Sequence, residues 1–178
     1  KEVRIPLAFR PEALAAPLVL SGTGVGGELA IPLEFGYTGP FFARVEGLAV
    51  PQIVMGEVSD DPLDFYTFLE NDAALPDHVR RYRITVPGGT RYLRVAAATL
   101  DEGAEDDIDL YVFCPERSCA DGNEGYASTT TGAVEFVDIY EPLPGEYVID
   151  IHGFETDDVV GGPGARFEMG TWLIAAAG

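Results

Sequence analysis

The chain has 178 residues, with 30 Asp and Glu against 11 Lys and Arg, so its formal net charge is −19 and its pI is near 4.2. A surface this acidic repels nucleic-acid phosphates and anionic membranes, because binding to either depends on Lys and Arg; we therefore expect no nucleic-acid partner and no membrane insertion. The 47% apolar residues exclude a disordered acidic tail. The start at Lys1, without a Met or a signal peptide, is expected either of a mature, processed chain or of a piece excised from a longer protein.

Short strands separated by turns dominate the pattern along the chain. Between the 21 Gly and 13 Pro lie runs that alternate apolar and polar residues or are rich in β-branched and aromatic side chains, as is typical of half-buried strands. The predicted strands, in chain order, are 3–9, 28–35, 40–45, 52–58, 82–86, 92–97, 108–113, 134–139, 147–152 and 167–174. The alanine-rich segment 11–20 contains two prolines and can form at most one or two helical turns. The pattern predicts an all-β protein, an antiparallel β-sandwich or jelly roll.

Two of the turns make sharper predictions. The Pro-Gly-Gly turn at 87–89 separates two strand-like runs, and glycine supplies the positive φ of a tight turn, so we predict a β-hairpin there. The turn at 142–145 leads into strand 147–152, where Tyr147, Ile149 and Ile151 share one face by alternation. We expect that face to lie in the core and the opposite face to be wet or mixed.

The length predicts one β-sandwich unit over residues 1–178. Within it we expect N-terminal strands in 1–70 and a second part in 71–178. The Asp- and Pro-rich segment 59–79 is the most loop-like internal stretch and the candidate boundary.

The two cysteines, Cys114 and Cys119, lie five positions apart across a turn that contains Pro115. A disulfide between them is geometrically feasible and would place the protein in an oxidising, extracellular compartment. The alternative is two unrelated thiols in a cytosolic protein. His78 and His152 do not show the spacing of a zinc finger.

The densest charged feature is the segment 101–109, which holds six carboxylates in nine residues. Calcium takes about 6–8 oxygen ligands, and clustered carboxylates on a turn suit it. Asp107 and Asp109 share a face of an extended strand, while Asp106 can approach from the loop and Glu102 lies just before it. These four residues are the candidate calcium ligands, although the segment lacks the glycine and the final glutamate of an EF-hand loop. A solvated acidic loop is the alternative.

Enzymatic patterns are weak in this chain. Neither histidine and no serine occurs in a recognised nucleophile context, so we expect no catalytic triad and no enzyme. Five arginines fall on the predicted hairpin, and we expect them to pair with the chain's own carboxylates rather than to form a docking patch: Arg80, Arg81, Arg83, Arg91 and Arg94. Trp172 in the last predicted strand favours a core position over a sugar-binding surface.

Two segments resemble a known family. Residues 106–112, Asp-Asp-Ile-Asp-Leu-Tyr-Val, are similar to its D-x-D-L-Y-V pattern, and residues 144–154 to its P-x-G-x-Y-x-V-x-V-x-G pattern. The family is the bacterial pre-peptidase C-terminal domain of secreted subtilisin-like serine proteases. Residues 31–39 and 47–48 resemble the segment that introduces this module, so the resemblance extends from about residue 28 to 174. The cysteine loop and the heavy acidic run depart from the family pattern.

The resemblance implies a secreted, non-catalytic β-sandwich that follows a peptidase catalytic domain in the same precursor. Relatives of the module are associated with secretion, with binding of substrates or surfaces, and in some cases with calcium. Protein or polysaccharide substrates are therefore candidate partners. Two alternatives stay open: a free-standing extracellular adhesin or carbohydrate-binding β-sandwich, and a hydrolase in its own right.

Overall fold

The computed structural model describes residues 14–15, 28, 30–40, 49–100, 106–156 and 164–175. The chain forms two compact units, Lys1–Arg44 and Val45–Gly178. In the first unit, strand β1 (Leu14–Ala15) pairs antiparallel with β2 (Glu34–Phe35). β1 lies in the alanine-rich segment 11–20, whose other residues lie outside the described ones, and the strand predicted over 28–35 is confirmed only at its last two residues. Predicted strand 3–9, and 40–45 beyond its first residue, lie outside the described residues.

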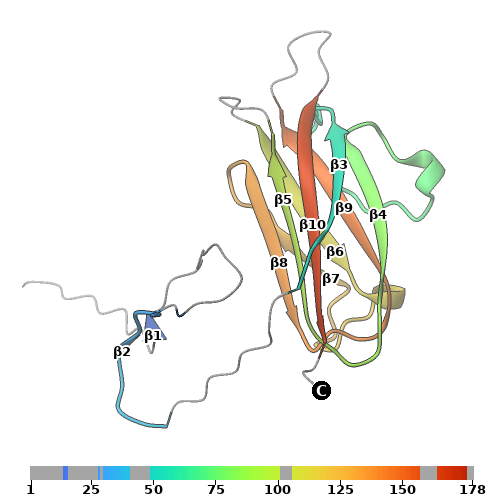
Figure 1. Ribbon diagram of the computed structural model, residues 1–178. Helices are drawn as coiled ribbons and strands as arrows, with labels where there is room; N and C mark the ends of the chain where they lie inside the picture. Colours follow the sequence, from blue (N-terminus) through green and yellow to red (C-terminus); the bar gives the residue numbers. More distant parts are fainter. Residues whose placement is uncertain are drawn as a thin grey trace, which may run out of the picture. The chain divides into compact units, whose positions relative to one another are not determined.

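The second unit is an antiparallel β-sandwich of two four-stranded sheets (Figure 1). Sheet I has the order β3-β10-β5-β8 and sheet II the order β4-β9-β6-β7, and every pairing is antiparallel. The strands are β3 (Gln52–Val58), β4 (Val79–Val86), β5 (Thr90–Thr99), β6 (Asp107–Phe113), β7 (Gly125–Ser128), β8 (Val134–Tyr140), β9 (Gly145–Glu155) and β10 (Ala165–Ala175). Two short 3-10 helices, η1 (Asp72–Ala74) and η2 (Pro115–Arg117), interrupt the loops. The predicted all-β sandwich is confirmed.

All seven strands predicted between residues 52 and 174 are present, and β7 is the additional one. β7 has only four residues, so its alternation is too short to stand out from the surrounding turns. Among the described residues the structure has no α-helix, and none of its helices is long and apolar enough to cross a membrane.

The hairpin predicted around residues 87–89 is wrong. β4 pairs with β9 in sheet II, whereas β5 pairs with β10 and β8 in sheet I, so the turn passes from one sheet to the other. The turn itself is tight, with Gly89 at φ 85° and the Thr90 amide donating to the Pro87 carbonyl. Val86 at the end of β4 and Leu93 in β5 are both buried in the core between the sheets. Burial of those side chains between the layers replaces the hydrogen bonds of a hairpin.

The core lies between the sheets and follows the alternation of each strand. Tyr147, Ile149 and Ile151 of β9 are buried there, as predicted. In β6 the inward residues are the fully buried aliphatic ones, Ile108, Leu110 and Val112. The residues that alternate with these in β6 and β9 therefore point to the outer face of sheet II.

The outer faces of the two sheets differ in what covers them. Residues 59–78, which connect β3 to β4 and are called here the covering segment, lie over the outer face of sheet II, where Tyr66 stacks on Tyr111 with ring centroids 3.9 Å apart. The outer face of sheet I instead exposes large apolar side chains: Ile53, Met55, Val134, Phe136 and Tyr140. The candidate boundary at 59–79 lies inside the second compact unit. The division of the chain into 1–70 and a family-like part 71–178 stays a prediction.

Candidate functional site

The main chain of Gly153 in β9 forms one of the attachments of the covering segment to sheet II. The Gly153 carbonyl accepts from the Asp61 amide at 3.0 Å, and its amide donates to the His78 carbonyl at 3.0 Å. The backbone of Ser59 passes so close that a Cβ on residue 153 would lie 2.2 Å from the Ser59 carbonyl oxygen. Only glycine permits this approach. The final glycine of the family-like 144–154 segment thus has a physical reason here.

Four ionisable side chains meet where the covering segment contacts β9 and β6. His152 of β9 is fully buried between two carboxylates, with Nε2 2.9 Å from Asp61 Oδ2 and Nδ1 3.3 Å from Asp109 Oδ2. His78 Nε2 lies 3.7 Å from the same Asp61 oxygen. Asp61 is itself buried and accepts hydrogen bonds from the amides of Leu63 and Phe65 at 3.0 and 3.2 Å. We call Asp61, His78, His152 and Asp109 the histidine cluster.

The contacts within the cluster shift the pKa values of Asp61 and His152. Burial acts to raise the pKa of Asp61, but hydrogen bonds from His152 and from two backbone amides, with the charge of His78, bring it below the ordinary value. Burial acts to lower the pKa of His152, but its hydrogen bonds to Asp109 and Asp61 and their charges raise it overall. The geometry is that of an imidazole held between two carboxyl groups.

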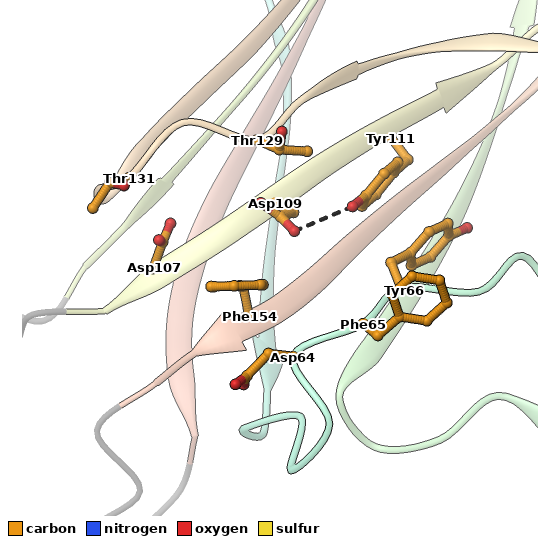
Figure 2. Close-up of a pocket in the computed structure, with 9 residues that line it drawn as sticks. All are labelled: Asp64, Phe65, Tyr66, Asp107, Asp109, Tyr111, Thr129, Thr131 and Phe154. Carbon is orange, nitrogen blue, oxygen red and sulfur yellow. Dashed lines mark hydrogen bonds between the residues drawn. The ribbon is translucent and has the colours of Figure 1, made fainter.

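An acidic pocket of about 340 Å³ opens beside this cluster on the outer face of sheet II (Figure 2). Asp107, Asp109 and Tyr111 reach it from β6, and the Tyr111 hydroxyl donates to Asp109 at 3.2 Å. The other side chains come from the covering segment, from the connection that follows β7, and from β9: Asp64, Phe65, Tyr66, Thr129, Thr131 and Phe154. The pocket therefore combines three carboxylates and two threonine hydroxyls with aromatic walls.

Like charges lie close together around Asp107. Burial raises the pKa of its carboxyl, the Gly132 amide partly offsets this, and the charges of Asp109, Glu135 and Glu155 raise it further. Glu135 is fully buried and orders the connection between β7 and β8, because its carboxylate accepts from the Ser128 and Thr130 side chains and from the Thr130 amide. A cation in this pocket would offset the repulsion.

The predicted calcium ligands fall in different places. Asp107 and Asp109 line the pocket together, as expected from their alternation on one strand face. Asp106 is buried and is not among the lining residues, and Glu102 lies outside the described residues. Asp64 and the two threonines were missed, because they are distant in sequence and belong to loops without a metal-ligand spacing.

The histidine cluster was also missed by sequence reasoning. Its four residues lie on three segments and are 17 to 91 positions apart in sequence, and finger-type spacing is absent. The available signal was the outward position of Asp109 and His152 on strands whose alternate residues are apolar. Antiparallel pairing makes Asp109 and His152 direct cross-strand partners.

The arginines predicted to pair with the chain's own carboxylates largely do so. Arg81 binds Asp150 and Asp72, Arg83 binds Asp72 and Glu146, Arg91 binds Glu141, and Arg94 binds Asp138. Arg80 instead donates to the Glu57 carbonyl. The expectation for Trp172 is wrong: its cross-strand neighbour is Arg94, on the outer face of sheet I, and it is only half-buried.

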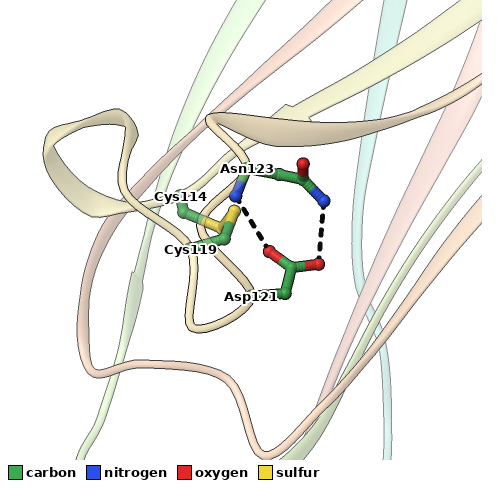
Figure 3. Close-up of a disulfide and its surroundings, with 4 residues drawn as sticks. All are labelled: Cys114, Cys119, Asp121 and Asn123. Carbon is green, nitrogen blue, oxygen red and sulfur yellow. Dashed lines mark hydrogen bonds between the residues drawn. A yellow bond between two sulfur atoms is a disulfide. The ribbon is translucent and has the colours of Figure 1, made fainter.

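The predicted disulfide between Cys114 and Cys119 is confirmed, with Cα atoms 5.2 Å apart (Figure 3). It closes the loop that contains η2, after β6. Asp121 orders the turn that follows by accepting from the Asn123 amide at 3.1 Å and from its side-chain nitrogen at 2.9 Å.

Comparisons with known proteins do not assign a family. No family model and no curated protein sequence matches the chain. Among solved structures, it is similar to the lipase BlEst2 of Bacillus licheniformis in its propeptide form (13% identity, TM-score 0.39, 75% of this chain and 24% of the lipase). It is also similar to PliG of Aeromonas hydrophila, a periplasmic inhibitor of g-type lysozyme, with 13% identity and a TM-score of 0.38 over 74% of this chain and 92% of PliG. A third similar structure is tailspike protein 4 of bacteriophage CBA120, with 14% identity and a TM-score of 0.29 over 72% of this chain and 18% of the tailspike chain. The chain spans about a quarter of the length of the lipase.

Proposed function

We propose that the chain is a non-catalytic accessory domain of a secreted subtilisin-like serine peptidase, acting in stability, secretion or the binding of a substrate or surface. The observation that carries the proposal is the pairing of β6 with β9. These strands contain the two family-like segments, and Leu110 lies opposite Ile151 in their register. Segments about thirty residues apart in sequence thereby form one continuous surface that borders the acidic pocket.

The buried histidine supports a non-catalytic role. A triad histidine needs one ring nitrogen toward a nucleophile and the other toward an orienting carboxylate. In His152 both ring nitrogens face carboxylates, those of Asp61 and Asp109, and the side chain is fully buried. The peptidase catalytic domain would then be a separate part of the same precursor.

An extracellular location is part of the proposal. The disulfide supports it, because such bonds persist in oxidising compartments and are rare in the cytosol. The net charge of −19 favours a solvated surface over contact with anionic lipids.

The coding sequence on the N-terminal side of Lys1 tests the accessory role directly. A subtilisin-type catalytic domain in that position is the expected result, and a precursor without any peptidase domain contradicts the proposal. The isolated chain should show no turnover of casein. Turnover that a single serine or carboxylate substitution abolishes would make it a hydrolase in its own right.

We further propose that the acidic pocket binds calcium and that calcium stabilises the domain. Asp64, Asp107 and Asp109 would supply carboxylate oxygens, with Thr129 and Thr131 as neutral oxygen donors, and hard oxygen ligands are those that calcium prefers. Bound calcium would supply positive charge in a pocket that three carboxylates line. The residues present fit such an ion in chemistry, although the pocket also has aromatic walls.

Chelation should lower the melting temperature and added calcium should restore it. With calcium about 100-fold above its Kd, the expected stabilisation is about 2.7 kcal/mol. Asp107→Ala and Asp109→Ala should each remove the response to calcium, whereas Asp77→Asn, an exposed carboxylate outside the pocket, should keep it. Identical melting curves for the wild type with and without chelator would exclude calcium.

A carbohydrate-binding or adhesive role is the second candidate, and the outer face of sheet I is the observation that favours it. Phe136 and Tyr140 project from β8 with 52% and 77% of their surface exposed, and Tyr92 pairs with Tyr140 at 5.2 Å between ring centroids. Exposed apolar patches of this kind mark interaction surfaces. Phe136→Ala and Tyr140→Ala should then weaken retention on an insoluble polysaccharide, while Met55→Ala on the same face should not. Equal retention of all variants would remove this candidate.

A further inference from the structure

We propose that Asp61, His78 and His152 bind one divalent transition-metal ion of the zinc class. One ligand atom from each of the three residues lies within 4.8 Å of the other two. Both imidazole Nε2 atoms face the same carboxylate oxygen, Asp61 Oδ2, at 2.9 Å from His152 and 3.7 Å from His78. Two imidazoles and one carboxylate are a donor set that zinc takes with a water as the fourth ligand.

The separations match a tetrahedral site after small movements. Ligand atoms about 2.0–2.1 Å from a zinc ion in tetrahedral geometry lie about 3.3 Å from one another. The two measured separations from Asp61 Oδ2 fall on either side of that value. The His78 and His152 rings are also nearly perpendicular, with an interplanar angle of 79°. All three ligand atoms lie within 4.8 Å of one another, so side-chain movements of about 1–1.5 Å would complete the geometry.

The surroundings of His152 are those of a metal-binding imidazole. Metal-bound histidines usually donate the other ring N–H to a carboxylate, which sets the tautomer and the orientation of the ring. Asp109 Oδ2 lies 3.3 Å from His152 Nδ1 and would accept that proton, which leaves Nε2 unprotonated toward the metal. Asp61 is oriented in the same way, by the amides of Leu63 and Phe65.

The main chain holds the three ligands in place. Asp61 and His78 are both hydrogen-bonded to Gly153, the residue after His152. His78 keeps 25% of its side chain exposed, and this exposure provides the entry path and room for a water ligand. A bound ion would join both ends of the covering segment to β9. It would thereby stabilise this segment, which forms one side of the acidic pocket.

Zinc titration of the intact chain tests this site. The protein is prepared without a histidine tag, stripped with EDTA, and titrated with zinc chloride by calorimetry in an excess of calcium. Calcium prefers oxygen ligands and should not compete for imidazole. The expected result is one zinc per chain. His78→Ala should weaken binding by more than about 100-fold. Asp109→Asn, which alters the support of His152 as well as the acidic pocket, should weaken it by about 10–100-fold.

Asp77→Asn is the matched control, because Asp77 is exposed and adjacent to His78 but is not one of the three ligands. Its zinc affinity should equal that of the wild type.

His78 is chosen over the buried His152 so that the variant folds, which circular dichroism verifies; His78→Gln is the substitute if His78→Ala does not fold. Absence of saturable zinc binding, or unchanged affinity in the His78 variant, overturns the proposal. Loss of zinc binding in Asp107→Asn with retention in His78→Ala would place zinc in the acidic pocket instead and also overturn it. Neither result depends on whether calcium stabilises the protein.

Discussion

Arg81 and Asp150 form a bidentate ion pair beneath the covering segment. Arg81 Nε lies 2.7 Å from Asp150 Oδ1 and Nη2 lies 2.6 Å from Oδ2, while only 4% of the arginine side chain and none of the aspartate is exposed. The remaining guanidinium nitrogen donates to the Leu69 carbonyl and to Asp72, and the Tyr66 hydroxyl donates to Asp150. The pair therefore connects β4 and β9 to the covering segment, and its hydrogen bonds raise the pKa of Arg81.

Arg81→Ala should destabilise the domain by about 3–5 kcal/mol, because it leaves the Asp150 carboxylate buried without its cation. Urea denaturation followed by tryptophan fluorescence measures the change. Arg91→Ala is the control, since Arg91 pairs with Glu141 on the surface and exposed pairs contribute about 0–1 kcal/mol. Equal losses in the two variants would mean that burial of the Arg81 pair has no energetic consequence.

Gly153→Ala should cost at least about 1–3 kcal/mol, because its Cβ would meet the Ser59 carbonyl at 2.2 Å and a backbone atom cannot rotate away. The covering segment should also lose protection, which amide hydrogen exchange of residues 59–78 measures. Gly88→Ala provides the comparison, since a Cβ there has nothing within 4 Å. A Gly153 variant as stable as the Gly88 variant would contradict the close approach of Ser59 to β9.

Lowering the pH should weaken the contribution of Asp138 to the free energy of unfolding. Burial acts to raise its pKa, but hydrogen bonds from Arg94 and Tyr92 and the charge of Arg94 lower it below the ordinary 3.8. A lowered folded-state pKa stabilises the protein above the unfolded-state value, and that stabilisation is lost as pH falls below about 4 toward the folded-state pKa.

Asp138→Asn should therefore lower the free energy of unfolding by about 1 kcal/mol at neutral pH. The difference between variant and wild type should shrink as the pH is lowered from about 4 to about 2. Chemical denaturation at several pH values measures it. A difference that stays constant or grows over this range would show that Asp138 contributes through its shape and not through its charge.

Strand positions and strand faces were predictable from residue patterns. In β9 the aliphatic alternation predicted Tyr147, Ile149 and Ile151 in the core, because each strand face meets one environment. The pairing of strands was not predictable in the same way. The turn at 87–89 suits a hairpin and a sheet-to-sheet connection equally well, and only the partners of β4 and β5 decide between them.

For the candidate site, too, contacts within one strand were predictable and contacts between distant segments were not. Asp107 and Asp109 share a strand, so their common face followed from alternation and the pocket contains both. Asp61 and His152 are 91 positions apart, and no local spacing indicates that they meet. The covering segment looked like a loop between domains because its Asp and Pro residues are typical of loops, yet its side chains satisfy buried polar groups of sheet II.

By itself the sequence determined the all-β architecture, the disulfide loop and the acidic strand end at Asp107 and Asp109, because each depends on neighbours within a few residues. Only the tertiary structure decided that Asp150 and His152 are buried and that carboxylates and histidines from three segments converge. The physical reason is that a charged residue on a strand face can remain solvated or be buried with partners. The outcome depends on which distant segment covers that face and which hydrogen bonds it brings.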